Sequence, residues 1–363
     1  MIDRVERLPC PEPDVGRVLT VLRRGRPDRV PLLELKLDEE VRSALAGEPL
    51  VSWWAREVPE RRRHAIRQFV RLMHRLGYDA FWLPTNVPFR FTTDAAADTA
   101  GLSRGDRAWQ SESAGPIQSW RDFEAYPWPT LADIDFGPAE EVARVLPDGM
   151  GCIGFCNGVF EWSSWLMGLE PFALAIYDQP DLLRALVDRV GGLIEEVFKV
   201  WSQREQMVAL WSGDDMGFKT ATLISPQHLR EYILPWHRRY AEIAHAQGKP
   251  YILHSCGNVR EIMPDLVEDV RIDAKHSFED TIQPVEEFHR LWHRRVAAIG
   301  GLDVDLLARG TEADVVRRTE SILAVCAPTG GYAAGSGNTV TNYVPIDNYL
   351  AMVETVHRYN GRA

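Results

Sequence analysis

The sequence predicts an α/β fold, a single (β/α)8 TIM barrel with a long insertion after its second strand. Two observations predict it: short apolar, β-branched segments recur along the chain, and amphipathic stretches separate most of them. Strands that alternate with helices pair in parallel, and eight such units can close into a barrel. A doubly wound open sheet is the alternative fold for the same pattern.

Eight segments are expected to form the strands, because each is a short apolar run that ends at glycine or a polar residue. They are residues 30–35, 78–83, 150–155, 207–211, 250–254, 272–276, 296–299 and 331–334. The expected helices are residues 58–76, 171–204, 226–247, 259–267, 285–294, 313–326 and 346–359. Ser225 and Pro226 mark the beginning of the third of these helices, and Gly248 follows its end.

One segment, residues 85–149, interrupts the regular spacing. It is rich in proline, aspartate, tryptophan and serine, which predicts a long insertion with little regular structure. Long connections after the C-terminal ends of barrel strands usually cover or line the active site, so we expect this insertion to act as a lid. Because a barrel of about 250 residues often carries insertions, residues 1–363 are expected to form one domain.

Composition excludes several classes of partner. The formal net charge of -11 argues against nucleic acid, whose phosphates require a basic face. No stretch approaches the roughly 18 apolar residues of a membrane span, and the N-terminus lacks the apolar core of a signal peptide. The five scattered cysteines fit a reducing compartment. We therefore expect a cytoplasmic protein that binds neither nucleic acid nor membranes.

Polar and ionisable residues follow each expected strand, where the C-terminal ends of barrel strands meet at one mouth. In strand order they are Glu34 and Lys36, Asn86, Cys156 and Asn157, Asp214 and Asp215, His254 and Cys256, His276 and Glu279, Asp303, and Ser336 and Asn338. Packing does not require so many such groups, so we expect the active site at this mouth.

The most specific motif is His-x-Cys-Gly at the end of the fifth expected strand. Side chains alternate along a strand, so His254 and Cys256 point to the same side, and Gly257 permits a sharp exit. Imidazole and thiolate are both ligands that suit Zn²⁺. The alternative interpretation is a buried thiol beside a hydrogen-bonded histidine.

Other site residues are expected from their positions. Asp214 and Asp215 lie in a glycine-flanked turn at the mouth, where carboxylates suit a general base or a hydrogen bond to a polar substrate. Together with His276 they are expected to act in catalysis. The glycine-rich segment around the last strand is where barrels often bind phosphate or bring the backbone close to a ligand. The residues expected to bind a cofactor or the substrate are Asn157, Ser336 and Asn338.

Several of these segments resemble one family. They are residues 26–35, 77–84, 213–259, 272–280 and 330–340. At these residues the chain resembles the uroporphyrinogen decarboxylase superfamily, and within it the corrinoid-linked methyltransferases more than the decarboxylases. The decarboxylases carry an arginine-rich loop after the first strand, whereas Arg23, Arg24 and Arg26 precede that strand here.

The resemblance implies a (β/α)8 barrel and, in the methyltransferase branch, a zinc ion held by His-x-Cys and by a further cysteine after the last strand. His254 and Cys256 match the first part of that pattern, and Ser336 stands where the last cysteine is expected. Candidates to complete the zinc shell are Glu34, His276 and Glu279. A partner protein that carries a corrinoid is also implied.

The expected function is that of a methyltransferase, a demethylating or methyl-transferring component of a corrinoid-dependent system. Zinc would polarise the heteroatom of a small-molecule methyl donor or acceptor, an ether, amine or thiol. Asp214 or Asp215 would orient the substrate or handle its proton. Two alternatives are a metal-independent decarboxylase or lyase that uses the aspartates and an arginine such as Arg90, and a non-catalytic barrel that serves as a binding subunit.

Overall fold

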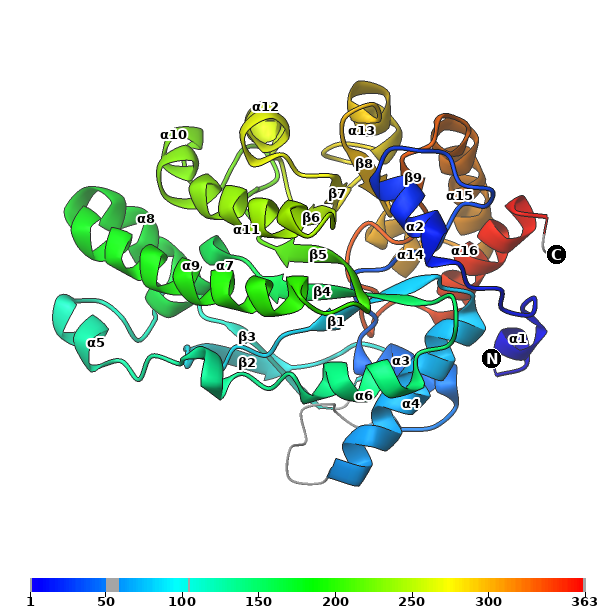
Figure 1. Ribbon diagram of the computed structural model, residues 1–363, viewed down its shortest axis with the longest axis horizontal. Coiled ribbons are helices and arrows are strands. Elements are labelled where there is room, and N and C mark those ends of the chain that lie inside the picture. The colour runs from blue at the N-terminus through cyan, green and yellow to red at the C-terminus, as the bar shows by residue number, and fades with distance from the viewer. Residues whose placement is uncertain (1, 50–58, 104, 362–363) are drawn as a thin grey trace.

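A parallel sheet of seven strands forms the centre of the structure, a computed structural model that describes residues 2–49, 59–103 and 105–361 (Figure 1). In sheet order the strands are β1 (Ala80–Pro84), β4 (Gly151–Asn157), β5 (Met207–Gly213), β6 (Tyr251–His254), β7 (Ala274–His276), β8 (Ala297–Ile299) and β9 (Tyr332–Ala333). Neighbouring strands of this sheet are parallel. Their C-terminal ends are level, because Gly213 pairs with His254 and His254 pairs with His276.

The first expected strand, residues 30–35, is an extended segment that lies beside the end of β9. A parallel bridge joins Leu32 to Ala334, just after β9. Pro31 has no N–H group to donate, so the segment forms isolated bridges instead of a regular ladder. Leu33 belongs to a buried interior cluster to which each of the seven strands contributes a residue. The fold is therefore the single (β/α)8 barrel that the sequence predicts.

Helices surround the sheet, and α9, for example, packs against β4 and β5 (Figure 1). Outside the insertion the helices are α1 (Ile2–Arg7), α2 (Val15–Leu22), α3 (Glu39–Ala46), α4 (Pro59–Leu76), α7 (Val159–Met167), α8 (Leu169–Asp178), α9 (Pro180–Ser202), α10 (Pro226–His228), η2 (Leu229–Ile233), α11 (Leu234–Ala246), η3 (Arg260–Ile262), α12 (Met263–Asp265), η4 (Leu266–Val270), α13 (Val285–Trp292), α14 (Val304–Arg309), α15 (Glu312–Cys326), η5 (Ala327–Thr329) and α16 (Ile346–Tyr359). No helix within the described ranges has both the length and the apolar character needed to cross a membrane.

The expected helices differ from these in detail. The stretch 171–204 is divided between α8 and α9 at Pro180, which cannot donate the hydrogen bond that would continue α8. The stretch 226–247 contains a π-helical turn, η2, immediately before Pro235 removes another donor. The stretch 259–267 is a series of short turns. Val58, the expected first residue of α4, lies outside the described residues.

The insertion, residues 85–149, has more regular structure than the sequence predicts. It contains an antiparallel hairpin of β2 (Thr93–Ala97) and β3 (Asp106–Gln110), followed by α5 (Trp120–Ala125), η1 (Leu131–Asp133) and α6 (Gly137–Val145). The expectation of little regular structure was wrong because both hairpin strands are largely exposed. An exposed strand buries no apolar face, so it leaves no alternation of apolar and polar residues in the sequence.

Candidate metal centre

A cavity of about 690 Å³ lies at the C-terminal ends of the strands. Residues from four strand ends line it, among them Trp82 of β1, Phe155 of β4, Gly213 of β5 and His254 of β6. Arg107 of the hairpin contributes to its rim. This is the mouth at which the sequence predicts the active site.

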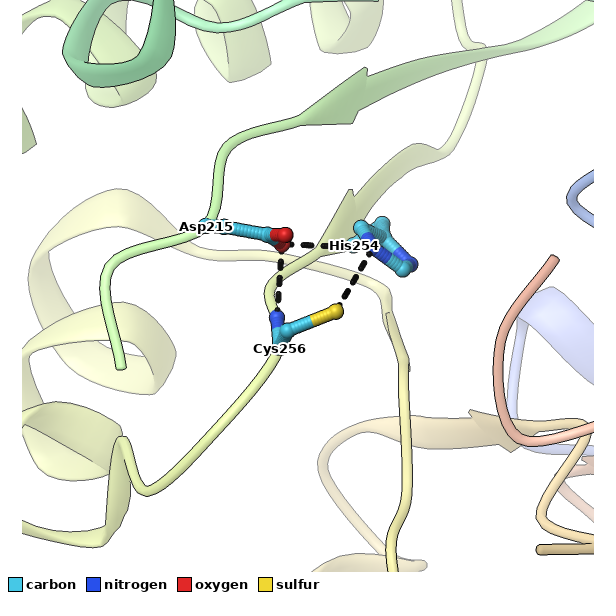
Figure 2. Close-up of side chains that lie close together, drawn as sticks. All are labelled: Asp215, His254 and Cys256. Atoms are coloured by element: carbon cyan, nitrogen blue, oxygen red, sulfur yellow. Dashed lines mark hydrogen bonds and ion pairs between the residues drawn. The ribbon is translucent and has the colours of Figure 1, made fainter. Parts of the chain in front are cut away.

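Three potential metal ligands meet beside this cavity (Figure 2). Asp215, His254 and Cys256 each offer one donor atom, and these atoms lie within 4.8 Å of one another. His254 Nε2 is 3.3 Å from Cys256 Sγ and 3.3 Å from Asp215 Oδ1. The oxygen, nitrogen and sulfur atoms therefore converge on one point.

The backbone brings the loop after β5 against the loop after β6. The Cys256 amide donates to Asp215 Oδ1 at 2.8 Å, and the Gly217 amide donates to the Cys256 carbonyl at 3.2 Å. A Cβ atom on Gly217 would lie 2.5 Å from that carbonyl oxygen, and Gly257 has a φ of 74°. Only glycine fits such an approach without strain, so this glycine pair allows the carboxylate to reach the thiol.

Asp215 is ionised in this arrangement. Burial alone would raise the pKa of its carboxyl group, but the hydrogen bond and charge of His254, with the amide of Cys256, bring the pKa below its usual value. A carboxylate in this form is an acceptor only, and can accept from an imidazole or bind a cation.

A chain of hydrogen bonds orients the His254 ring. His276 Nε2 lies 3.2 Å from the Ser336 carbonyl oxygen, which can only accept, so this nitrogen carries a proton. Burial, with the nearby His254 and Lys275, lowers the pKa of His276 well below its usual value, so the ring is neutral and its Nδ1 is an acceptor. His254 Nδ1, at 2.6 Å, must then donate to it.

Because His276 holds the proton on Nδ1, His254 would offer the lone pair of Nε2 to a metal ion placed between Asp215 and Cys256. Metal-binding histidines commonly donate their other ring N–H to a supporting group, which fixes the tautomer. Both ring nitrogens of His276 are engaged, so it supports His254 and has no lone pair left for a metal ion.

The Cys256 sulfur is held as an acceptor. Asn338 Nδ2 donates to Sγ at 3.1 Å, and the Ser277 hydroxyl donates at 3.5 Å. Burial, followed by the charge of Asp215, raises the pKa of the thiol well above its usual value. A bound cation would reverse that effect, because a thiol that coordinates a metal ion is deprotonated.

The donor types, and the two separations that involve His254, fit the requirements of zinc. Ligand bonds of 2.0 to 2.3 Å at tetrahedral angles place donor atoms about 3.4 to 3.6 Å apart. The observed separations of 3.3 Å from His254 Nε2 to Sγ and to Oδ1 are close to these values. Three protein ligands leave a fourth position, as in catalytic zinc sites. Asp215 and His254 also line the cavity, so a substrate bound in the cavity would lie beside these metal donors.

Asp214 lies outside this group despite its position next to Asp215. Its carboxylate is fully buried and accepts from the amides of Phe160 and Glu161 at 3.1 and 2.7 Å. His237 Nε2 lies 2.7 Å from the same carboxylate. Asp214 therefore fixes the beginning of α7 to the end of β5, and its contacts give no support to a catalytic role.

Ser336 and Glu34 form a separate buried network. The Ser336 amide donates to Glu34 Oε1 at 2.9 Å, and its hydroxyl contacts both Glu34 Oε2 and the Asn338 carbonyl oxygen. One hydroxyl proton cannot serve both oxygens, so Glu34 itself supplies a proton to Ser336 Oγ. Burial raises the pKa of Glu34 to about 8, against the opposing hydrogen bonds of Ser336, which agrees with this assignment.

The remaining expected site residues are divided between two places. Asn157 and Asn338 line the cavity, and Asn338 also contacts Cys256. Glu279 lines a neighbouring cavity instead. Within the described residues, neither Glu34 nor Glu279 belongs to the group of metal donors, and Asp215 provides the carboxylate.

Glu161, in the first turn of α7, was missed by the sequence analysis. Its side chain lines the cavity, where burial, and then the charges of Asp215 and Asp214, raise the pKa of its carboxyl group well above the usual value. The available signal was its distance from a strand end: only Gly158, Val159 and Phe160 separate it from the last residue of β4. First-turn helix residues lie beside the barrel mouth.

The hairpin is attached to the rim of the cavity. Arg107 donates to Asp38 Oδ2 at 3.1 Å and to Asn342 Oδ1 at 3.0 Å. Asn342 in turn donates to Asp98 at 2.5 Å. Part of the insertion therefore contacts the cavity wall.

Comparisons with known proteins identify similar chains. A family model described as uroporphyrinogen decarboxylase (URO-D) matches residues 56–359. A uroporphyrinogen decarboxylase from Anaeromyxobacter dehalogenans is 26% identical over 230 residues, which cover 60% of this chain and 61% of that protein. A methylated-thiol–coenzyme M methyltransferase from Methanosarcina mazei is 25% identical over 254 residues, covering 68% of this chain and 65% of that protein. The match thus spans less than two thirds of either relative's length.

A solved structure gives a further likeness in fold. A methyltransferase from Methanosarcina mazei superposes with a TM-score of 0.69 at 17% sequence identity, covering 96% of this chain and 99% of the other. At that identity the likeness shows the shared barrel architecture alone.

Proposed function

The chain belongs to the uroporphyrinogen decarboxylase family, and from this premise we propose that it is a methyltransferase whose metal ion is held by Asp215, His254 and Cys256. The observation that carries the proposal is the convergence of three donors of different chemistry beside a cavity at the barrel mouth. The methyltransferase relative from Methanosarcina mazei supports the reaction type. The substrate would be a small methylated molecule.

Zinc bound to these residues would act as a Lewis acid toward the thiol, ether or amine heteroatom that gives or receives the methyl group. The other residues position this site. His276 keeps the proton on His254 Nδ1 and so leaves Nε2 as a ligand, and Asn338 holds Sγ in place. Glu161 lines the cavity and can exchange a hydrogen bond or proton with the substrate.

The proposal includes a partner protein that carries a corrinoid as the second methyl carrier, on the basis of the resemblance in sequence. It also includes a lid role for residues 85–149 within a single domain of residues 1–363, supported by the contacts of Arg107 with Asp38 and Asn342. A cytoplasmic location stays a prediction from the scattered cysteines.

A decarboxylase acting on a polycarboxylate receives less support. Such a substrate needs arginine or lysine side chains to bind its carboxylates. Arg90, the arginine suggested by the sequence, is exposed and is not among the described residues that line the cavity. The cavity contains more acidic than basic side chains.

Metal content tests the proposal. Protein purified without chelator is measured by elemental mass spectrometry as wild type, Cys256→Ser and Cys10→Ser. Cys10 is an exposed cysteine outside the cavity and provides a matched control. We expect about one zinc per chain in wild type and Cys10→Ser, and loss of zinc in Cys256→Ser. Absence of metal from all three, or equal metal in all three, would overturn the proposed centre.

A further inference from the structure

Two aromatic rings form a corner of the cavity. Trp82 of β1 and Phe155 of β4 both line it and also pack on the interior core of the barrel. Their ring centroids are 5.1 Å apart and their planes are inclined by 69°. Two inclined rings that line one cavity could supply two walls of an aromatic cage.

The cavity is also strongly acidic. Among the described residues that line it, seven are aspartate or glutamate and three are lysine or arginine. Each of the three cations has an acidic neighbour: Lys36 and Arg107 lie 3.4 and 3.1 Å from Asp38, and Arg42 lies 3.7 Å from Glu39. Even with Glu161 protonated, six acidic side chains stand against three cations, and a divalent ion at the metal centre would not reverse that excess of three negative charges.

One acidic side chain in the cavity has no cationic neighbour within the described residues. Glu161 lines the cavity, and within the described chain its side chain makes no hydrogen bond or ion pair. The nearby acids, Asp215 and Asp214, add negative potential at this position. Burial raises the pKa of Glu161 first, and these two charges raise it further, so the carboxyl group tends to hold its proton when no ligand is bound. A cation bound beside it would be attracted by Asp215 and Asp214 and would favour the ionised form of Glu161.

Resting on the proposed function, we infer that the methylated substrate is an ammonium cation, held with its methyl groups in the corner of Trp82 and Phe155 and its charge near Glu161. Aromatic faces attract quaternary ammonium groups, because the ring quadrupole is negative above the ring plane. The fully methylated nitrogen has no lone pair and no N–H group, so it can neither bind the metal ion nor donate a hydrogen bond, and aromatic faces and a carboxylate are the groups that recognise it. The metal ion would then act on a thiol that accepts the methyl group, and the demethylated tertiary amine would be the leaving group. The cavity volume of about 690 Å³ suits a small molecule of this class.

Binding of a matched pair of probes tests this inference without turnover. Choline carries a trimethylammonium group, and 3,3-dimethyl-1-butanol has the same shape without the charge. Calorimetric titration of wild type is expected to show binding of choline at least about tenfold tighter than binding of the neutral alcohol. The affinity for choline is expected to fall as salt is raised, as for any partly exposed charge pair.

Variants locate the site. Trp82→Leu is expected to weaken choline binding about five- to thirtyfold, and Glu161→Gln about tenfold or more. Trp292→Leu and Glu287→Gln on α13, which is outside both the insertion and the described cavity lining, should bind as wild type does. Phe155→Leu replaces Trp82→Leu if circular dichroism shows that the latter does not fold.

Three outcomes would overturn the inference: equal binding of both probes, absence of choline binding, or preference for a neutral methoxyarene such as guaiacol. The test is repeated with Cys256→Ser to separate it from the metal proposal. Choline binding that persists in a zinc-free variant would preserve the inference even if the metal centre is wrong. Conversely, a protein that binds zinc but not choline would overturn this inference and leave the metal proposal intact.

Discussion

The Nδ1 atoms of His254 and His276 lie 2.6 Å apart, so the protonation of one imidazole determines that of the other. The two residues are register partners on β6 and β7, and the Ser336 carbonyl oxygen fixes the far nitrogen of His276. The barrel sheet thus determines which nitrogen of His254 faces Asp215 and Cys256. Because strand register already fixes the orientation of the His254 ring, binding of a metal ion requires little reorganisation of this ligand.

His276→Gln should weaken zinc binding about 10- to 100-fold, because His254 loses the acceptor that fixes its tautomer and ring orientation. The zinc dissociation constant is measured by competition with a chelating dye. His64→Gln on the exposed side of α4 is the control and should leave the constant unchanged. An unaltered constant in His276→Gln would show that the hydrogen bond does not orient His254.

The adjacent aspartates should respond differently to the same substitution. Asp215→Asn removes a charged donor from the candidate metal centre, so zinc affinity should fall while the free energy of unfolding changes little. Asp214→Asn disturbs a buried network with His237, so stability should fall by about 2 to 4 kcal/mol while zinc affinity stays within a few fold. Urea unfolding and dye competition on both variants check this. The reverse pattern would exchange the two assigned roles.

Stability should depend on pH through Glu34. Its pKa is raised by burial to about 8, whereas an unfolded glutamate has a pKa of about 4.3. Between these values the folded chain binds more protons than the unfolded chain, so this group lowers stability as pH rises, by at most about 1.4 kcal/mol per pH unit. Glu34→Gln mimics the protonated form and should remove this loss.

The measurement for Glu34 is the free energy of unfolding in urea at several values between about pH 5 and pH 8. Glu124→Gln, at an exposed position, is the control and should keep the wild-type slope. If Glu34→Gln and wild type lose stability in parallel over this range, the buried carboxyl group is not protonated as the hydrogen-bond pattern requires.

Sequence patterns predicted the barrel well because most strands of its sheet are short, largely apolar runs, as is usual for buried parallel strands. They could not separate Asp214 from Asp215, since neighbouring residues at a strand end face opposite sides and the direction of the turn decides which enters the cavity. Ser336 occupies the position where a cysteine was expected, but only the structure brings its hydroxyl to Glu34 instead of the donors. Glu161 enters the cavity from helix α7, whereas the sequence pattern pointed only to residues that directly follow a strand.

The attachment of the hairpin to the rim yields a prediction about mobility. Arg107→Ala removes the contacts with Asp38 and Asn342, whereas the hydrogen bond between Asn342 and Asp98 remains. The Arg107 side chain is 44% exposed, so its ion pair contributes at most about 1 kcal/mol. Loss of that much local stability should speed amide exchange in residues 93–110 about two- to fivefold, without a measurable change in global unfolding.

Hydrogen–deuterium exchange with mass spectrometry resolves this segment from the barrel. Arg144→Ala on α6 is the control. It removes a more exposed ion pair, with Glu141, inside the insertion but away from the hairpin, and should leave residues 93–110 unchanged. If the hairpin acts as a lid, weaker attachment to the rim should also raise the KM of the methyl-transfer reaction more than it lowers kcat. The reason is that a lid retains bound substrate but does not touch the reacting atoms. Unchanged exchange in Arg107→Ala would mean that Asp98 and Asn342 alone hold the hairpin on the cavity.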